Sequence, residues 1–172
     1  MKLRIQPTNR ESFLSDSEFI ISKTDTKGRI VYGNKVLVEM SCFQEHELLG
    51  KQHNIVRHPD MPRSIFKILW DRIQAGNEYN GYVINLRKDG GFYWIFTNVT
   101  PSYDPSGKLI GYYSVRRKPG RDALNTIKPL YEKMVAAEKQ AGAKGAIAAS
   151  MAILNDLLDD KGVSYDKFVC TL

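Results

Sequence analysis

The first alternation of apolar and polar residues along the chain predicts a β-hairpin. Segments 18–24 and 29–33 are short and contain Ile and Val, and the intervening residues 25–28 end in Gly28. Glycine readily adopts the positive φ that a tight turn requires. Helical spacing of apolar residues follows from Asn34, an N-cap type of residue, to Met40, and a second short helical segment over 45–49 is closed by Gly50.

A loop, a longer helix and three strands are predicted next. Residues 51–62 carry two prolines and no periodicity, whereas 62–76 has an apolar stripe ended by Gly76. Three strands with clear turns between them are predicted over 81–87, 92–102 and 109–117. Strands separated by a helical block indicate an α+β fold, with a five-stranded antiparallel sheet and short helices on one face.

Everything from Asp122 onward is predicted to be helical. Apolar residues in this region follow one another at spacings of four, three and four, which suits helix pairing: Ile147, Met151, Leu154 and Leu158. This stripe could pair with a second copy, pair with another helix, or fold back onto the chain's own sheet. We expect three parts: an N-terminal cap (1–17), a central domain (18–121) and a C-terminal helical extension (122–172).

Composition narrows the class of protein. With 42% hydrophobic residues among 172, the chain can build a packed core. Its two cysteines, Cys42 and Cys170, cannot form a disulfide framework, which fits a reducing cytoplasm. The most apolar tract, 145–158, is shorter than the roughly 20 residues that cross a bilayer, so no membrane span is expected.

The net charge of +6 is concentrated in one segment. Between Arg116 and Lys144 there are eight Lys or Arg against three acids, a balance of +5. Acids interrupt these cations and aromatic residues do not alternate with them. We therefore interpret the segment as a solvated helix face and expect no nucleic-acid partner.

The densest chemistry lies in the loop His53-Asn54-Ile55-Val56-Arg57-His58-Pro59-Asp60-Met61-Pro62. Arg57 offers a planar fork of donors for phosphate or carboxylate, His58 is a switchable donor, and Asp60 can orient either side chain. A ligand-binding role and a structural role, in which Asp60 pairs with Arg57 and caps the next helix, both fit these residues. His53, His58 and Asp60 could nominally form a metal site, but no spacing rule selects that arrangement. Paired carboxylates, an activated nucleophile and a phosphate-binding glycine loop are not recognisable, so we predict that the chain is not an enzyme.

The order of elements, with Asn85-Leu86-Arg87-Lys88-Asp89-Gly90 before a long aromatic strand, resembles a PAS domain, the small sensory fold of bacterial signalling. The loop 53–62, followed by Phe66 and Trp70, is similar to the PAS domains of bacterial aerotaxis receptors. The resemblance extends over about residues 18–134, including Gly111-Tyr112-Tyr113-Ser114-Val115-Arg116.

That resemblance implies a non-covalent FAD site and a role in reading redox state. By position, Arg57, His58 and Asp60 match residues associated with FAD binding, and Asn34 and Asn85 match cavity asparagines. An amide such as Asn85 suits the polar edge of an isoalloxazine because it donates and accepts hydrogen bonds. The complete set of expected cofactor-binding residues is Asn34, His53, Arg57, His58, Asp60, Phe66, Trp70, Tyr79, Asn85, Tyr93 and Ile95.

Two departures from related proteins matter. Tyr79 stands where the family often has a Trp, and the loop 51–61 lacks the cysteine that light-sensing PAS domains use for a flavin adduct. We expect a cytoplasmic redox or oxygen sensor that signals through its C-terminal helices, either as a homodimer or to a chemotaxis receptor or kinase. The alternatives are a PAS domain that binds haem, with His53 or His58 as axial ligand, and a cofactor-free interaction module.

Overall fold

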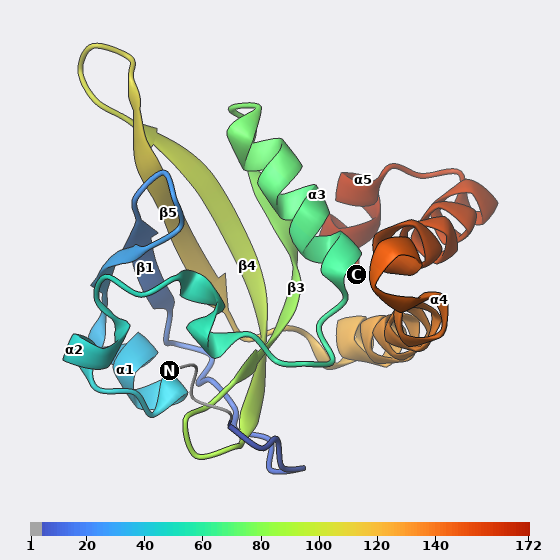
Figure 1. Cartoon of the computed structure of the whole chain (residues 1–172), viewed down its shortest axis with the longest axis horizontal. Coiled ribbons are helices and arrows are strands. Elements are labelled where there is room, and N and C mark those ends of the chain that lie inside the picture. The colour runs from blue at the N-terminus through green and yellow to red at the C-terminus, as the bar shows by residue number, and fades with distance from the viewer. Residues whose placement is uncertain (1–4) are drawn as a thin grey trace.

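The structure is a computed structural model and describes residues 5–172. Its centre is a five-stranded antiparallel sheet with the order β2-β1-β5-β4-β3 (Figure 1). The strands are β1 (Ile20–Thr24), β2 (Ile30–Gly33), β3 (Tyr79–Leu86), β4 (Phe92–Tyr103) and β5 (Leu109–Arg117). The predicted α+β fold is confirmed, and each predicted strand is present with ends shifted by at most two residues.

The helices between β2 and β3 lie on one face of the sheet (Figure 1). They are α1 (Lys35–Ser41), α2 (Glu45–Leu48), the 3-10 turn η1 (His53–Val56) and α3 (Arg63–Gln74). The predicted stripe of α3 faces inward: Ile65 and Ile73 are buried, and Phe66, Leu69 and Trp70 pack against the same core. Burial of one apolar face supplies most of the stability of so short a helix.

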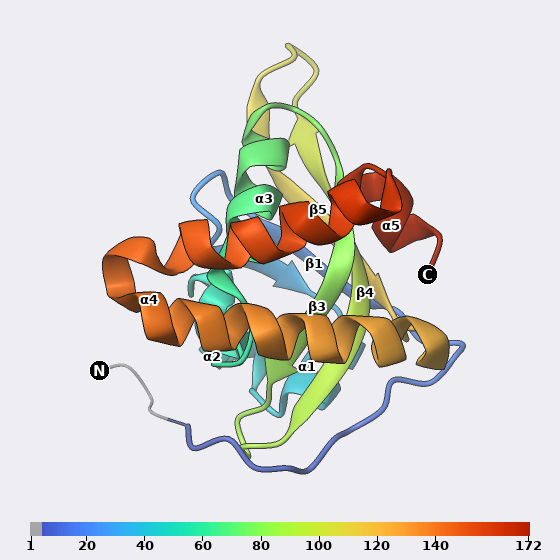
Figure 2. The same cartoon turned by 90° about the vertical axis from the view of Figure 1, so that its right-hand side faces the viewer.

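The C-terminal helix α4 (Arg121–Lys161) is bent into a hairpin. Gly142 has non-helical dihedrals, with φ of 69°, and divides α4 into a first arm (121–141) and a second arm (143–161). Figure 2 shows both arms running across β3. Tyr131 of the first arm donates a hydrogen bond to the Tyr82 carbonyl, 2.8 Å away, which fixes this arm to the edge strand.

The second arm uses its apolar stripe inside the molecule. Leu154 is buried, Met151 and Leu158 pack against the core, and Ile147 lines a cavity described below. Of the three arrangements left open by the sequence, these contacts correspond to folding back within the chain. Ile147 is still 39% exposed, so this end of the stripe also faces solvent.

Helix α5 (Tyr165–Cys170) packs against β3 and also contacts α3. The hydroxyls of Tyr165 and Tyr79 are 2.8 Å apart in a buried hydrogen bond, and their rings stack. Arg72, in the last turn of α3, donates to Asp166 at 2.7 Å. The C-terminal helices are thus attached to both the sheet and α3.

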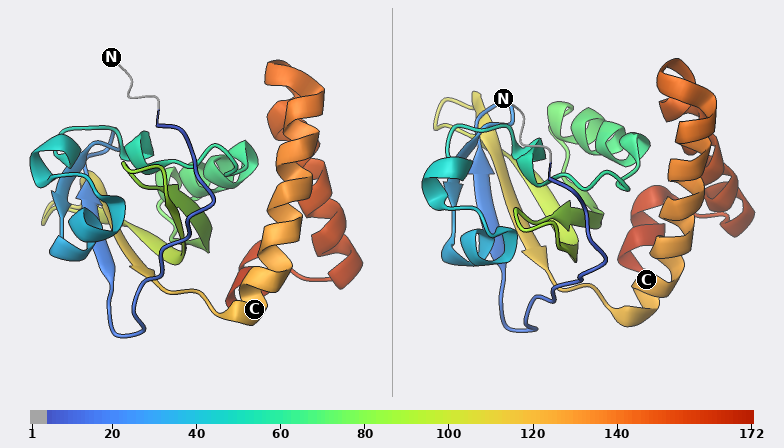
Figure 3. Two further views of the ribbon diagram at one scale, coloured as in Figure 1. Left: turned by 90° about the horizontal axis from the view of Figure 1, so that it is seen from below. Right: turned by 60° about the horizontal axis from the view of Figure 1, so that its bottom comes forward.

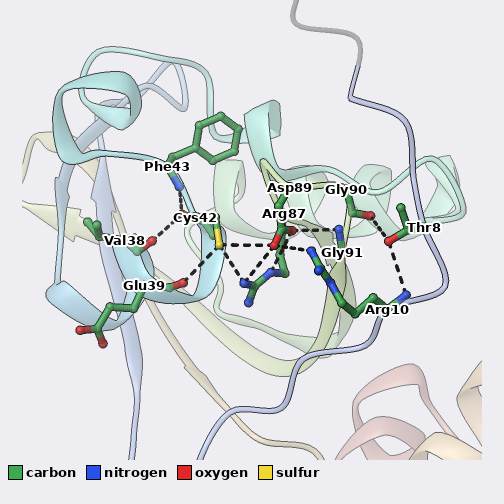
Figure 4. A network of polar contacts seen from close by, with 11 residues as sticks. Thr8, Arg10, Val38, Glu39, Cys42, Phe43, Arg87, Asp89, Gly90 and Gly91 are labelled. Carbon is green, nitrogen blue, oxygen red and sulfur yellow. Dashed lines mark hydrogen bonds and ion pairs between the residues drawn. The ribbon is translucent and has the colours of Figure 1, made fainter.

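The N-terminal segment is held against the turn between β3 and β4 (Figure 3). The backbone N–H of Thr8 donates to the Gly90 carbonyl, and Arg10 donates from its guanidinium to Asp89 at 2.6 Å. Figure 4 shows that Asp89 also accepts from Arg87, which donates to the Cys42 sulfur. This network ties three separate parts of the chain together at one end of the sheet.

No helix within residues 5–172 combines the length and the apolar character needed to cross a membrane.

Candidate ligand-binding site

A cavity of about 510 Å³ lies between the sheet and α3. A volume in this range suits a drug-sized or cofactor-sized molecule. Its wall is largely apolar, with Phe66, Leu69 and Trp70 from α3 facing Val83 and Ile95 from the sheet. The Trp70 ring meets Tyr112 of β5 edge to face, with 5.8 Å between ring centroids. The shape defined by these residues accommodates a flat, apolar ring system.

The loop that carries His53 and Arg57 is pinned on both sides by backbone contacts. His53 donates its backbone N–H to the Gly28 carbonyl at 2.9 Å, which attaches the loop to the first hairpin. Arg57 forms an isolated antiparallel bridge with Asn85 of β3. These contacts with the first hairpin and with β3 place the side chains of His53 and Arg57 at the cavity wall.

The polar end of the cavity contains Arg116, His53, Ser22 and Asn85. One guanidinium nitrogen of Arg116 lies 2.8 Å from the Ser22 hydroxyl and 2.6 Å from Nε2 of His53. The other terminal nitrogen is buried and has no hydrogen-bond partner among residues 5–172. A buried guanidinium with an unused donor and no carboxylate in contact is costly, unless a ligand supplies the missing acceptor.

The titration behaviour of this group follows from its burial. Burial, and then the charge of Arg116, lower the pKa of His53 to about 3, so the imidazole is neutral and its Nε2 can accept from Arg116. Burial lowers the pKa of Arg116 to about 10, which leaves the guanidinium charged near neutral pH. The pair therefore presents a positive charge and an oriented imidazole to the cavity.

Acidification tests this assignment of His53. Because the unfolded chain takes up a proton near pH 6.5 and the folded chain only near pH 3, the unfolding free energy falls as pH decreases through that window. The expected slope approaches about 1.4 kcal/mol per pH unit from this one group. Urea unfolding at pH 7 and at pH 4.5 measures this change in the free energy of unfolding. His53→Gln should reduce the slope, whereas the exposed His46→Gln should leave it unchanged; equal slopes in all three proteins would contradict the assignment.

Four cationic side chains interrupt the apolar wall of the cavity. Arg57, Arg63, Lys67 and Arg116 line it, and no Asp or Glu does so within the described chain. Arg57 and Arg63 also line an adjoining, larger groove of about 1160 Å³, together with Lys51 and His58. Glu47 is the acidic residue of that groove, and it is engaged by Lys88 at 2.6 Å. Such a surface favours an anionic ligand that occupies both spaces.

Several predicted residues are brought together by the fold. Those lining the cavity are His53, Arg57, Phe66, Trp70, Asn85 and Ile95. Arg57 lies over the Phe66 ring, 4.7 Å from its centroid, and donates to the Met61 carbonyl. His58 is buried beside the Phe92 ring and lines the larger groove instead.

Other predicted residues lie elsewhere. Asn34 caps α1 by accepting from the Leu37 N–H, and it also accepts from Ile21, so its amide braces the first hairpin outside the cavity. Tyr79 is buried against Tyr165 of α5. Tyr93 is buried on β4 opposite Asn85 but does not line the cavity. The contacts of Asn34 and Tyr79 are those of structural residues, whereas the Tyr93 hydroxyl is buried without a hydrogen-bond partner among residues 5–172.

The structural interpretation of Asp60 is also corrected. Asp60 does not pair with Arg57; its carboxylate is 3.8 Å from Nδ1 of His58, and its N–H donates to that same nitrogen. The first turn of α3 is capped by Glu138 of α4 instead, which accepts from the Arg63 N–H at 2.7 Å. Among the described residues, no group of three or more His, Cys, Asp or Glu is placed to hold a metal ion.

Some residues that line the cavity were not predicted from the sequence, and Arg116 is the most important of them. Tyr112, Ser114 and Arg116 all line the cavity, as the alternation of side chains along β5 requires. Arg116 pairs across the sheet with Thr97, another lining residue. The two-residue periodicity of β5 was the available signal. Ile147 could not have been found in this way because it reaches the cavity from α4.

The family follows from fold and sequence together. The PAS fold family matches residues 8–117, which is more than half of the chain, so the protein belongs to the PAS family. Two solved light-oxygen-voltage domains have the same fold at a TM-score of 0.57: one from work on a flavin analogue, 20% identical, and the light state of the blue-light photoreceptor Aureochrome1, 19% identical. They cover 64% and 67% of this chain, and the alignments span 83% and 91% of theirs.

More specific similarity comes from sequence relatives. The aerotaxis receptor of Escherichia coli (strain K12) is 35% identical over 127 residues, which is 74% of this chain and 25% of the receptor. The nitrogen fixation regulatory protein of Klebsiella oxytoca is 26% identical over 62% of this chain and 21% of its own length. The chain thus matches about a quarter or less of these relatives. The chain is a PAS-family protein that is similar to parts of a receptor and of a regulatory protein.

Proposed function

We propose that this protein holds FAD non-covalently and reports the redox state of its surroundings to a signalling partner. The observation that carries the proposal is the buried Arg116 guanidinium at the polar end of the cavity, with one terminal nitrogen unpartnered among residues 5–172. The resemblance of the loop 53–62 to aerotaxis receptors supports the same cofactor.

The donor set fits an isoalloxazine ring. Asn85 offers a donor and an acceptor together, as the carbonyl and imide N–H of a flavin require. Arg116 offers an additional donor with a positive charge, and Phe66 and Trp70 provide the apolar wall for a flat ring. His53, neutral and hydrogen-bonded to Arg116, holds the guanidinium in place.

The larger groove favours FAD over a shorter flavin. Arg57 and Arg63 line both spaces, so they stand where a phosphate-bearing chain would leave the cavity. Lys51 extends the positive charge along the groove. A dinucleotide would use both volumes, whereas riboflavin would use only the first.

A bound flavin supplies reversible redox chemistry that changes charge inside the cavity. This chain's own residues then exclude water, orient the ring through Asn85 and favour negative charge through Arg116. The proposed role is sensory and not enzymatic, and the relatives are likewise named as a receptor and a regulatory protein. We place the sensor in the cytoplasm, where its free thiols Cys42 and Cys170 would stay reduced. Its partner would be a second copy or a signalling protein such as a chemotaxis receptor or kinase.

Absorption spectroscopy tests the proposal. Protein mixed with FAD and desalted is expected to keep a flavin band, and Asn85→Leu is expected to weaken retention about tenfold, as the loss of a hydrogen bond to a buried polar group would. A Soret band in the purified protein would favour haem, although Nε2 of His53 is occupied by Arg116. A colourless protein that does not retain FAD would favour a cofactor-free interaction module.

A further inference from the structure

Helix α3 contacts both the ligand cavity and the C-terminal helices. Its inner side lines the cavity with Phe66 and Trp70. Its two ends are held from the other side, by Glu138 at the first turn and by Asp166 at Arg72 in the last turn. If an occupant of the cavity displaces α3, the contacts of α3 with α4 and α5 must therefore change.

Glu138 makes the central contact. Its carboxylate is buried, and one oxygen accepts from the N–H groups of Arg63 and Ser64 at 2.7 and 3.4 Å. The same oxygen accepts from the Ser150 hydroxyl at 2.7 Å. Because Pro62, the N-cap residue of α3, provides no side-chain cap, the Glu138 carboxylate supplies the acceptor and the negative charge that a helix N-terminus favours. One group thus joins α3 to both arms of α4.

The second arm of α4 is also part of the cavity wall. Ile147, one turn before Ser150, lines the cavity together with Arg63 and Phe66. The charge of Glu138 reaches Arg57 as well: burial lowers the pKa of Arg57, and Glu138 acts in the opposite direction. An anionic occupant beside Arg57 would therefore alter the electrostatic environment of Glu138.

Two glycines delimit this arm as a separate helical unit. It is bounded by Gly142 and Gly162, both with positive φ, of 69° and 61°. Its one large, fully buried apolar side chain is Leu154, whereas the first arm buries several, among them Ile127, Leu130 and Met134. We therefore expect the second arm to be the less stable of the two arms.

We propose that Glu138 is a latch that couples occupancy of the cavity to docking of the second arm, 143–161. The inference rests on the proposed FAD site and names the element that reports its state. The coupling is reciprocal: FAD stabilises the docked arm, and a docked arm strengthens FAD binding by the same factor. The second arm and α5 are then the output of the sensor.

Amide hydrogen exchange with and without FAD tests the coupling. FAD is expected to slow exchange of residues 143–161 by about fivefold or more, the usual lower range for coupled sites. Ser150→Ala removes the contact between the second arm and Glu138 but leaves the cap on α3, so it should speed exchange of 143–161 without FAD and reduce the slowing that FAD produces. Glu138→Gln should increase the exchange rate of 143–161 more than Ser150→Ala does, because it weakens the contacts with both α3 and the second arm. Glu132→Gln, an exposed carboxylate of the first arm, is the matched control and should behave as wild type.

The outcomes separate the two proposals. Wild-type protein that retains FAD but shows identical exchange in 143–161 would overturn the latch and leave the FAD site standing. FAD that slows exchange of 143–161 equally in Ser150→Ala and in wild type would also overturn the latch, because the Ser150 contact would then carry none of the coupling. Wild-type protein that does not bind FAD would overturn both proposals. Circular dichroism shows whether Glu138→Gln keeps the helix content of wild type. If it does not, Ser150→Ala alone tests the latch.

Discussion

Replacing Arg57 with alanine is expected to weaken FAD binding by about 30-fold or more. Arg57 lines both the cavity and the adjoining groove, and its guanidinium is held by the Phe66 ring and the Met61 carbonyl. A fixed guanidinium can bind phosphate oxygens with two hydrogen bonds, and losing one partner of a buried charged pair costs about 2 kcal/mol or more. Titration of apoprotein with FAD, followed by flavin fluorescence, measures the change.

Riboflavin provides the internal control for this variant. It carries the same ring but no phosphate, so its affinity should be nearly the same for wild type and Arg57→Ala. Arg57→Lys keeps the charge but loses the planar fork, and it should bind FAD with intermediate affinity. An equal loss for riboflavin and FAD would show that Arg57 shapes the loop and does not contact the phosphates. Thermal unfolding of the apoproteins detects such a structural effect independently.

Local patterns were sufficient to predict the elements of this fold. Alternating residues in β3 and β4, and glycine-containing turns beside them, set the strands within two residues of their observed ends. The stripe of α3 was predicted for the same reason, because its burial follows from helical periodicity. The kink at Gly142 was not predicted: in an Ala-rich helix one glycine is tolerated, and only the packing of the second arm on α3 shows that the chain reverses there.

The site was predictable where its residues share one loop or one strand. His53 and Arg57 lie in a loop of unusual composition, and Asn85 follows the alternation of β3. Contacts between distant segments could not be predicted from local sequence patterns. Arg116 and Ser22 are 94 residues apart in the sequence, and Glu138 and Arg63 are 75 apart. Asn34 illustrates the converse, because an asparagine before a helix serves equally well as a cap, and here its amide is used for that purpose.

Removing the charge of Arg116 should make a bound flavin harder to reduce. Reduction adds negative charge to the cavity, and the buried guanidinium stabilises it in a medium of low dielectric. For Arg116→Met we expect the midpoint potential to fall by about 60 mV or more, which is a tenfold change for a one-electron couple. Spectroelectrochemical titration of the FAD-loaded variant measures this shift. Arg116→Lys retains a charge and should lie close to wild type.

The pH dependence of that potential tests the partnership between Arg116 and His53. In the wild-type protein burial and then the guanidinium hold the pKa of His53 at about 3, so His53 takes up no proton between pH 5 and 8. Without Arg116 that repulsion is lost, and negative charge in the cavity favours protonation of His53. The potential of Arg116→Met should therefore vary more steeply with pH than that of wild type, and Arg116→Met with His53→Gln should lose the additional slope. If the additional slope persists in the double variant, the proton does not reside on His53 and another group must take it up.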